Sequence, residues 1–359
     1  MKEVEKMEKF KIVQIGCGKM SKYIMRYVYE KGGVIVGAVD KNKDLIGKDI
    51  GFVMEKEDKN VFIDDAKDLD KILKENHPDV AIITTMSFLN DIEESIRTCV
   101  KNGVNVLTTC EEAFYPENSN PNLYQELDSL AKAFNVTITG CGYQDIFWCN
   151  MISSICASTS KITKIKGISS YNVEDYGIAL AKAHGAGLTE SEFEKEIGSM
   201  NHMDKKTLQN LIDNRAFFPS YMWNVMGALC DKLQLHITDI SQELVPVLTD
   251  EELTSSTLNM TLKKGDVRGM NACVKASTKE NILLEIMCIG KVYTEEEKDI
   301  NDWTIFGEPT TRTVNEEPNT VLLTCADIVN RIPDVYHMSS GFVPISKYPE
   351  PHFLMSLQK

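Results

Sequence analysis

The sequence predicts an α/β protein in which an N-terminal doubly wound parallel sheet precedes a C-terminal α+β domain built on a mostly antiparallel open sheet. Residues 10–140 alternate short β-branched apolar runs with amphipathic runs, the pattern of strand–helix–strand units with buried strands. After about residue 150, polar helical segments and long runs with period-2 alternation indicate strands joined by short turns. The 359 residues suffice for two domains, which we place at 1–148 and 149–332, and we expect residues 333–359 to pack back on the first.

The first domain contains five predicted strands, which are short and rich in β-branched residues. The helical run at 90–103 starts with Asn-Asp and stops at a glycine, as helices commonly do. The strands lie at 10–16, 34–40, 80–85, 104–109 and 136–140, and the helices at 19–31, 68–76, 90–103 and 120–135. Strand–helix–strand crossovers are right-handed, so the carboxyl ends of these strands should meet at one edge of a parallel sheet.

The second domain is predicted to be richer in long strands. Its first strand covers 162–173, and its longest β-like runs cover 258–278 and 281–293. Polar helices are expected at 189–198 and 205–213, and a helix at 320–332 closes the domain. The segment after that helix is rich in proline, which favours an irregular tail.

The composition argues against several classes of partner. A formal net charge of -14 disfavours nucleic acid and anionic membranes, and it suits a cationic small substrate. No apolar run approaches the ~18 residues that span a bilayer, and the charged leader lacks the core of a signal peptide. The 10 cysteines form no CxxC pair and the 6 histidines no HExxH motif, so we expect a reduced, cytoplasmic protein without a metal site.

A glycine-rich turn, IGCGKMS at 15–21, follows the first strand and opens the first helix. Gly16 permits a tight turn, and Gly18 lets the backbone approach a pyrophosphate at the helix N-terminus. Ser21 replaces the third glycine but is small enough for helix packing. Asp40, at the tip of the second strand, is placed to accept hydrogen bonds from ribose hydroxyls. The pattern predicts a Rossmann-type NAD(P)-binding domain, and the alternative is a purely structural glycine turn.

The residues after the second strand favour NAD as the cofactor. The Asp40 carboxylate repels a 2′-phosphate, whereas Lys41 and Lys43 offset part of that repulsion. We therefore predict that NAD is preferred and NADP tolerated. Lys19 and Met20, at the start of the first helix, complete this end of the predicted cofactor site.

Three strand ends should face the reacting centre, because ligands bind beyond the carboxyl ends of the strands in such sheets. They cover residues 84–87, 109–112 and 140–145. We assign Thr84, Thr85, Ser87 and Cys110 to the cofactor, and Tyr143, Gln144 and Asp145 to the substrate.

Two adjacent carboxylates, Glu111 and Glu112, stand at the middle strand end. No Lys or His accompanies them, although enzymes that oxidise an alcohol usually use one of these as the base. A carboxylate suits an amine, because it attracts the ammonium group and can accept its proton. The chemistry favours an amine substrate over an alcohol, and the alternative is a solvated strand end.

Longer stretches add a family resemblance that runs from about residue 10 to about residue 350. IGCGKMS, VGAVDKNKDLIGKDIG, LTTCEEAFYP, GCGYQDIFWCN, KIKGISSYNVEDYGIALAKAHGAGLT, PSYMWNV and NDWTIFGEPTTRTVNEEP follow one another as in 2,4-diaminopentanoate dehydrogenases. The sequence resembles these enzymes of ornithine fermentation, which are related to the native amine dehydrogenases and more distantly to dihydrodipicolinate reductases. The stretches at 164–188 and 301–318 are much more specific than the glycine turn.

The resemblance implies NAD(P)-dependent oxidative deamination of 2,4-diaminopentanoate at C4, giving 2-amino-4-oxopentanoate and ammonium. It also implies a homodimer whose second domain contributes an extended sheet to the interface. In the related amine dehydrogenases a glutamate after the fifth strand is the key catalytic group, which corresponds to Glu111 or Glu112. Further substrate-binding candidates lie in the stretch at 164–188, and a purely structural role is the alternative for each. They are Tyr171, Asn172, Tyr176 and His184.

Other functions remain open at this point. A family member with a relaxed pocket would prefer simple short amines. A dihydrodipicolinate-type imine reductase would need a Lys- and His-rich stretch near residue 150, which GYQDIFWCNMISS lacks. A non-catalytic NAD(P)-binding protein would not need acidic strand tips.

Overall fold

The computed structural model describes residues 8–359, apart from the side chains of Ala179 and His202. The chain forms two compact units. The first unit holds the chain up to Ile146 and again from Thr320 to Lys359, and the second holds Phe147–Asn319.

A seven-stranded parallel sheet forms the centre of the first unit, in the order β15-β6-β5-β4-β1-β2-β3. The doubly wound parallel sheet predicted from the alternating apolar runs is therefore confirmed. Strands β1 and β4–β6 are almost wholly buried, as their apolar runs predicted. Its strands are β1 (Lys11–Ile15), β2 (Val34–Asp40), β3 (Ile63–Asp65), β4 (Val80–Ile83), β5 (Asn105–Thr108), β6 (Thr137–Gly140) and β15 (Gly341–Phe342).

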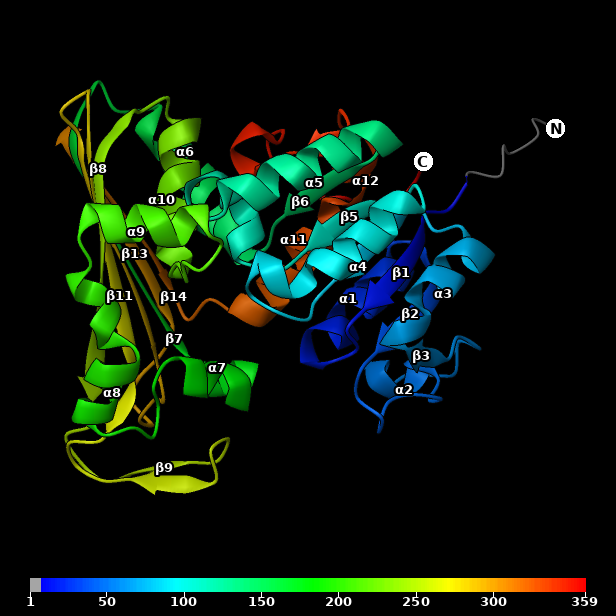
Figure 1. Cartoon of the computed structure of the whole chain (residues 1–359), viewed down its shortest axis with the longest axis horizontal. Helices are drawn as coiled ribbons and strands as arrows, with labels where there is room; N and C mark the ends of the chain where they lie inside the picture. The colour runs from blue at the N-terminus through cyan, green and yellow to red at the C-terminus, as the bar shows by residue number, and fades with distance from the viewer. Residues whose placement is uncertain (1–7) are drawn as a thin grey trace. The chain divides into compact units, whose positions relative to one another are not determined.

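Helices cover both faces of this sheet. Helices α3, α4 and α5 lie on one face and α1, α11 and α12 on the other (Figure 1). Each of the long helices turns an apolar stripe inward; α4, for example, buries Leu89, Ile92 and Ile96. The helices are α1 (Lys19–Glu30), α2 (Ile50–Met54), α3 (Leu69–Asn76), α4 (Leu89–Lys101), α5 (Pro121–Phe134), α11 (Thr320–Asn330) and α12 (Ile332–His337).

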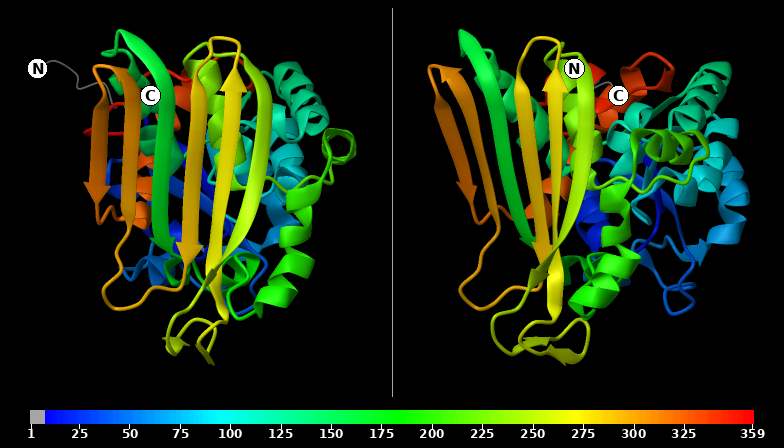
Figure 2. Two further views of the ribbon diagram at one scale, coloured as in Figure 1. Left: turned by 90° about the vertical axis from the view of Figure 1, so that its left-hand side faces the viewer. Right: turned by 60° about the vertical axis from the view of Figure 1, so that its left-hand side comes forward.

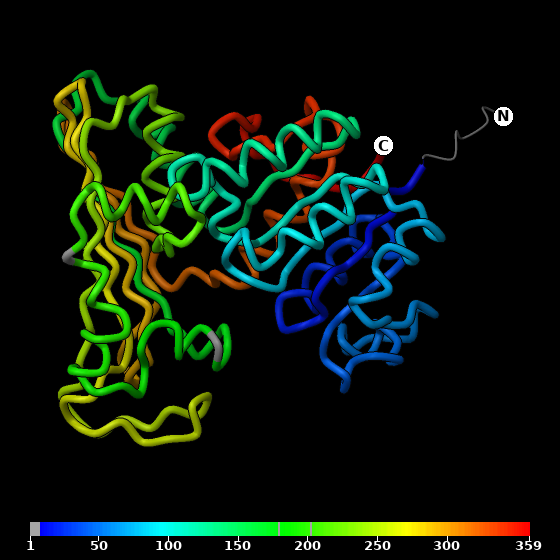
Figure 3. Tube along the Cα trace, viewed as in Figure 1, coloured from blue at the N-terminus to red at the C-terminus, as the bar shows by residue number. Residues whose placement is uncertain are grey.

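The C-terminal part differs from the sequence-based division at residue 332. Helix α11, which we expected to close the second domain, belongs to the first unit, where the Cys325 thiol donates to the Met20 carbonyl of α1 at 3.4 Å. The segment after it is also more regular than predicted, because β15 joins the sheet beside β6 and places Phe342 in the core. Figure 3 shows this return of the chain to the first sheet. The apolar side chains of α11 and β15 explain the difference, because they find a buried face there.

The second unit is built on a six-stranded open sheet in the order β14-β13-β7-β12-β11-β8. Its neighbours are antiparallel except for β7 and β12, which run parallel, so the predicted mostly antiparallel sheet is confirmed. Helices of this unit lie on one face, and Figure 2 shows the other face toward the viewer. The strands are β7 (Lys161–Asn172), β8 (Ile237–Leu248), β11 (Val267–Thr278), β12 (Leu283–Lys291), β13 (Ile300–Glu308) and β14 (Thr311–Glu316), and a separate hairpin holds β9 (Leu253–Ser255) and β10 (Met260–Leu262). The helices are α6 (Met151–Cys156), α7 (Ile178–Ala183), α8 (Glu190–Glu196), α9 (Lys205–Asp213) and α10 (Tyr221–Lys232).

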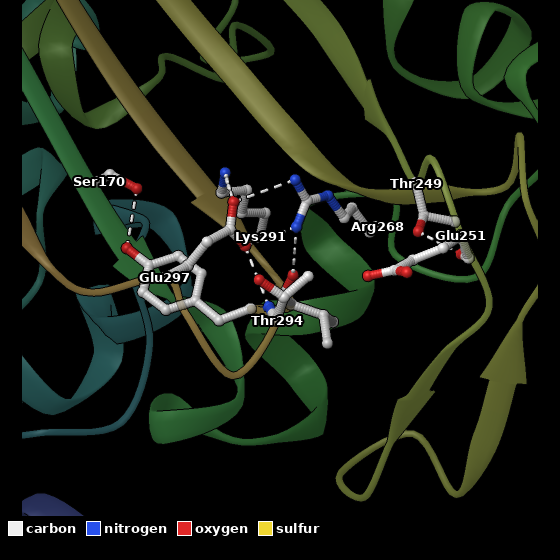
Figure 4. A network of polar contacts seen from close by, with 9 residues as sticks. Ser170, Thr249, Glu251, Arg268, Lys291, Thr294 and Glu297 are labelled. Atoms are coloured by element: carbon white, nitrogen blue, oxygen red, sulfur yellow. Dashed lines mark hydrogen bonds and ion pairs between the residues drawn. The ribbon is translucent and has the colours of Figure 1, made fainter.

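A charged cluster fixes the connection after β12 in this sheet (Figure 4). The Arg268 guanidinium donates to both carboxylate oxygens of Glu297, at 2.6 and 3.1 Å, and the Lys291 ammonium binds the same carboxylate. The backbone N–H of Thr294 donates to it as well, at 3.0 Å. The pKa of Glu297 is lowered to about 2 because these hydrogen bonds outweigh the effect of burial.

Candidate functional site

The glycine turn after β1 has a backbone conformation that favours glycine at its first position. Gly16 has φ +88°, and a Cβ added there would lie 2.7 Å from the Thr85 Cγ2 atom. The Thr84 hydroxyl donates to the Gly16 carbonyl at 3.0 Å and so ties the turn to the end of β4. Ser21 is fully buried, and its hydroxyl donates to the Gly18 carbonyl at 2.7 Å. Thr84 and Thr85 thus shape the glycine turn from the neighbouring strand end.

Open space lies over the start of α1. A Cβ added at Gly18 would meet no atom within 4 Å, and no side chain caps the N-terminus of this helix. A cavity of about 370 Å³ opens beside it, and an ion pair of 2.6 Å joins Lys22 and Glu55 there. The N–H groups of a helix N-terminus and lysine ammonium groups fit an anionic dinucleotide. The cavity is lined by Cys17, Gly18, Lys19, Lys22, Leu45, Phe52, Val53 and Glu55.

Asp40 faces this turn from the end of β2. Its carboxylate accepts hydrogen bonds from the backbone N–H groups of Cys17, at 2.5 Å, and Asn42, at 2.6 Å. The two hydrogen bonds fix the orientation of the Asp40 carboxylate and occupy one lone pair on each of its oxygens. The remaining lone pairs suit hydroxyl donors such as those of a ribose. Met20, the second residue of α1, also lies at this turn and is half-buried.

The structure separates the two adjacent glutamates. Glu112 is 3% exposed, and its carboxylate accepts hydrogen bonds from the Leu89 backbone N–H and the Ser119 hydroxyl, at 2.7 and 2.8 Å. Leu89 is the first residue of α4, so Glu112 caps that helix. Both oxygens of Glu112 are engaged within the protein, and a structural role replaces the catalytic role that we considered for it.

Glu111 has the properties of a proton acceptor. It begins the turn after β5 and is half-buried, and the Ser87 side chain hydrogen-bonds to its carboxylate. Burial raises the pKa of Glu111 from 4.5 to about 7. A carboxyl group with a pKa near the working pH can take up and release a proton efficiently.

Cys110, which we assigned to the cofactor, is instead internal. It is fully buried, and its thiol donates to the Ser87 carbonyl at 3.1 Å. Burial raises the pKa of this thiol well above its usual value, so it stays protonated. Its role is to join the ends of β4 and β5 beneath Glu111.

The loop after β6 packs directly on the turn that carries Glu111. A Cβ at Gly140 would lie 2.5 Å from the Ala113 carbonyl carbon, so only glycine fits. The Cys141 N–H donates to the Thr108 carbonyl at 3.0 Å. Tyr143 and Gln144, predicted to bind substrate, follow in this loop and are 5% and 8% exposed.

Asp145 is placed differently from the prediction. It is fully buried, and the Arg331 guanidinium donates to it at 2.7 Å. An internal ion pair therefore replaces its predicted contact with substrate. Sequence reasoning missed Arg331 and its neighbour Asp327, although charged residues within the apolar run TVLLTCADIVNRI gave a usable signal.

In the second unit, three of the predicted substrate residues form one cluster. The Tyr171 hydroxyl lies 2.7 Å from Nε2 of His184, whose Nδ1 lies 2.9 Å from the Leu180 carbonyl. The Tyr171 and Tyr176 rings meet edge to face, with centroids 5.5 Å apart. Burial lowers the pKa of His184 to about 4, so the ring is neutral and accepts the Tyr171 hydrogen bond through Nε2.

Asn172, the fourth of these residues, has a structural role. Its side chain accepts a hydrogen bond from the Glu174 backbone N–H at 3.2 Å and caps the turn after β7. Its own N–H donates to Asp299 at 3.1 Å. This local bonding supports the structural alternative that we considered for Asn172.

Two classes of site are not found in the part of the chain that the structure describes. No helix there is both long enough and apolar enough to cross a membrane. Within the same residues, no group of three or more His, Cys, Asp and Glu side chains is arranged to hold a metal ion.

Comparison with known proteins identifies the family. A family model for the C-terminal domain of 2,4-diaminopentanoate dehydrogenase matches residues 148–359, and one for the N-terminus of dihydrodipicolinate reductase matches residues 10–112. A 2,4-diaminopentanoate dehydrogenase of Acetoanaerobium sticklandii is 26% identical over 255 residues, which cover 69% of this chain and 67% of the relative.

Solved structures show the same relationship. An amine dehydrogenase from Mycobacterium smegmatis is 33% identical with a TM-score of 0.88, and the match covers 97% of this chain and 98% of that one. An oxidoreductase from Agrobacterium radiobacter, solved with NAD+, L-tartaric acid and magnesium, shares the fold with a TM-score of 0.54 at 9% identity, covering 94% and 93% of the two chains. This chain is an NAD(P)-dependent oxidoreductase acting on amine donors, and it belongs to the 2,4-diaminopentanoate dehydrogenase family.

Proposed function

We propose that the protein catalyses NAD(P)-dependent oxidative deamination of 2,4-diaminopentanoate at C4, giving 2-amino-4-oxopentanoate, ammonium and reduced cofactor. The observation that carries this proposal is the Glu111 carboxyl group, half-buried at the carboxyl end of β5 with its pKa raised to about 7. Membership of the family and its A. sticklandii relative support the choice of substrate.

Glu111 has two proposed tasks. It first accepts a proton from the C4 ammonium group, which leaves a neutral amine able to lose hydride from C4. A bound nicotinamide would supply the hydride acceptor. Glu111 then orients a water molecule, whose oxygen adds to the iminium carbon before ammonia leaves. The raised pKa helps, because the ionised carboxylate is then basic enough to take the proton near neutral pH.

Cofactor binding is assigned to the glycine turn and its cavity. Gly16, Gly18 and the start of α1 would hold the pyrophosphate, with Thr84, Thr85 and Ser87 at the adjoining strand end. Lys19 lines the cavity. Asp40 would accept the ribose hydroxyls, so we propose that NAD is preferred and NADP tolerated. Comparing kcat/KM for the two cofactors tests this, and a strong preference for NADP contradicts it.

Substrate recognition is assigned to two groups of residues. Tyr143 and Gln144 lie in the loop beside the Glu111 turn, and Tyr171, oriented by neutral His184, lies in the second unit beside Tyr176. A tyrosine hydroxyl that donates its proton to a histidine can also accept a hydrogen bond from an ammonium group through its oxygen. Each assignment predicts a higher KM for the diamino acid when the polar atom is removed.

We also propose a homodimer formed through the open face of the second unit's sheet. Strand register places Val245, Leu283, Phe306 and Val314 on one face, and each is at least 36% exposed. The opposite face buries Ile286 and Trp303. Several large apolar side chains exposed on one sheet face commonly mark an interface. Introducing lysine at Val245 and Leu283 should lower the mass in sedimentation, while lysine at exposed Phe134 should not; a monomeric wild type contradicts the proposal.

A second candidate is a dehydrogenase of simple short amines, since the match to an amine dehydrogenase from M. smegmatis supports amine chemistry without specifying the diamino acid. The test follows cofactor absorbance with NAD+ or NADP+ and three substrate types: 2,4-diaminopentanoate, short monoamines and 2-hydroxy acids. Faster turnover of the diamino acid supports the proposed substrate, and turnover of monoamines alone reassigns it. Turnover of 2-hydroxy acids alone contradicts the amine chemistry.

A further inference from the structure

We propose that Asp327, on helix α11, is a positioning residue that holds the Glu111 turn in place through the backbone of Gly142. Asp327 accepts a hydrogen bond from the Gly142 N–H at 3.0 Å. One turn earlier on the same helix, the Thr324 hydroxyl accepts from the Tyr143 N–H at 3.3 Å. Residues three apart on a helix lie on one face, so α11 accepts hydrogen bonds from two successive backbone amides of the loop after β6. This inference deepens the proposed function, on whose assignment of Glu111 its catalytic consequence depends.

The loop after β6, which α11 holds in place, restricts the conformation of the turn that carries Glu111. Gly140 touches the Ala113 backbone so closely that no Cβ fits, and Cys141 is bonded to Thr108 at the end of β5. Gly142 has φ +142°, and a Cβ there would meet the Thr324 Cγ2 atom at 3.0 Å. Helix α11 therefore contacts the loop after β6, and this loop in turn contacts the residues that follow Glu111.

The surroundings of Asp327 favour its neutral form. It is 6% exposed, and burial together with the charge of Asp145 raises its pKa well above the usual value. Its proton is shared with Asp145 by a side-chain hydrogen bond, while Asp145 also accepts from Arg331. Arg331 in turn donates to Asp334 at 2.8 Å and to the Pro349 carbonyl at 2.9 Å. An uncharged carboxyl that both donates and accepts can be replaced by a carboxamide, which does the same.

The chain offers a matched control in Asp334. This residue belongs to the same cluster, and from the first turn of α12 its carboxylate accepts a hydrogen bond from the same Arg331 at 2.8 Å. Asp334→Ala therefore removes an ion pair without removing the hydrogen bond between Asp327 and the Gly142 N–H. Thr324→Val is a milder second variant, since it removes only the acceptor for Tyr143.

The test combines hydrogen–deuterium exchange of the full-length protein with kinetics. Asp327→Ala should speed exchange in peptides covering 140–146 and 111–116, and lower kcat by about tenfold without changing cofactor affinity. Thr324→Val should speed exchange in 140–146, and Asp327→Asn and Asp334→Ala should exchange like the wild type. Equal exchange in Asp327→Ala and Asp334→Ala, or fast exchange in Asp327→Asn, would overturn the proposal. If Asp327→Ala does not fold, the exchange rates of Thr324→Val and Asp327→Asn test the proposal in its place. The exchange readout needs no substrate, so failure of the amine chemistry is distinguishable from failure of this inference.

Discussion

Replacing Glu111 by Gln should make the protein more stable at alkaline pH. The native pKa of Glu111 is about 7, against 4.5 for an ordinary glutamate. Below pH 4.5 both states hold the proton and the residue has no net effect. Above pH 7 both states are ionised, and the native state carries a cost of about 3 kcal/mol for the buried charge. Stability is thus lost as pH rises from about 4.5 to about 7, where the unfolded state ionises before the native state does, and a neutral glutamine avoids this loss.

The assay compares unfolding midpoints in urea for the wild type and Glu111→Gln at about pH 5 and about pH 9. All three tryptophans, Trp148, Trp223 and Trp303, lie in the second unit, so far-UV circular dichroism is needed to follow the first. The stability advantage of the variant should grow by up to about 3 kcal/mol between the two pH values. Glu117→Gln is the control, because Glu117 is exposed on the next turn. An advantage that does not change with pH would refute the argument that Glu111 is held in a desolvated site.

Three further predictions concern other residues to which a role has been assigned. Glu112→Ala should lower the free energy of unfolding by about 2–3 kcal/mol, because α4 loses its cap and Ser119 its acceptor; an unchanged urea midpoint would show that the carboxylate is not structural. Asp40→Ala should reduce the preference for NAD over NADP by about tenfold in kcat/KM, the equivalent of one ~1.4 kcal/mol interaction, and an unchanged ratio would remove Asp40 from cofactor selection. Tyr171→Phe should raise KM for the diamino acid by about tenfold and leave cofactor affinity unchanged, whereas a change confined to thermal stability would make the Tyr171–His184 pair purely structural.

The sequence was sufficient to predict the parallel sheet because its strands are buried on both faces and read as unbroken apolar runs. The glycine turn could also be predicted from the sequence, because the positive φ at position 16 next to β4 favours glycine. The place of α11 was not predictable in this way. Its apolar surface is recognisable in the sequence, but which unit it covers depends on contacts with α1, some 300 residues earlier.

The roles of Glu111 and Glu112 show what sequence alone leaves open. The two residues have the same chemistry, and nothing in LTTCEEAFYP distinguishes them. The distinction comes from the start of α4, where the Leu89 N–H points at Glu112, and from Ser119 seven residues later. Asp145 was misassigned for a similar reason, because its partner Arg331 lies 186 residues away in the chain.

The most direct test of the proposed chemistry is the rate of cofactor reduction by 2,4-diaminopentanoate in the wild type, Glu111→Gln and Glu112→Gln, at saturating NAD+. The wild type should turn over, Glu111→Gln should lose at least about 100-fold in kcat, and Glu112→Gln should stay within about tenfold of the wild type. A 100-fold loss confined to Glu112→Gln would reverse the assignment of the catalytic carboxylate. Full activity in both variants would contradict the account.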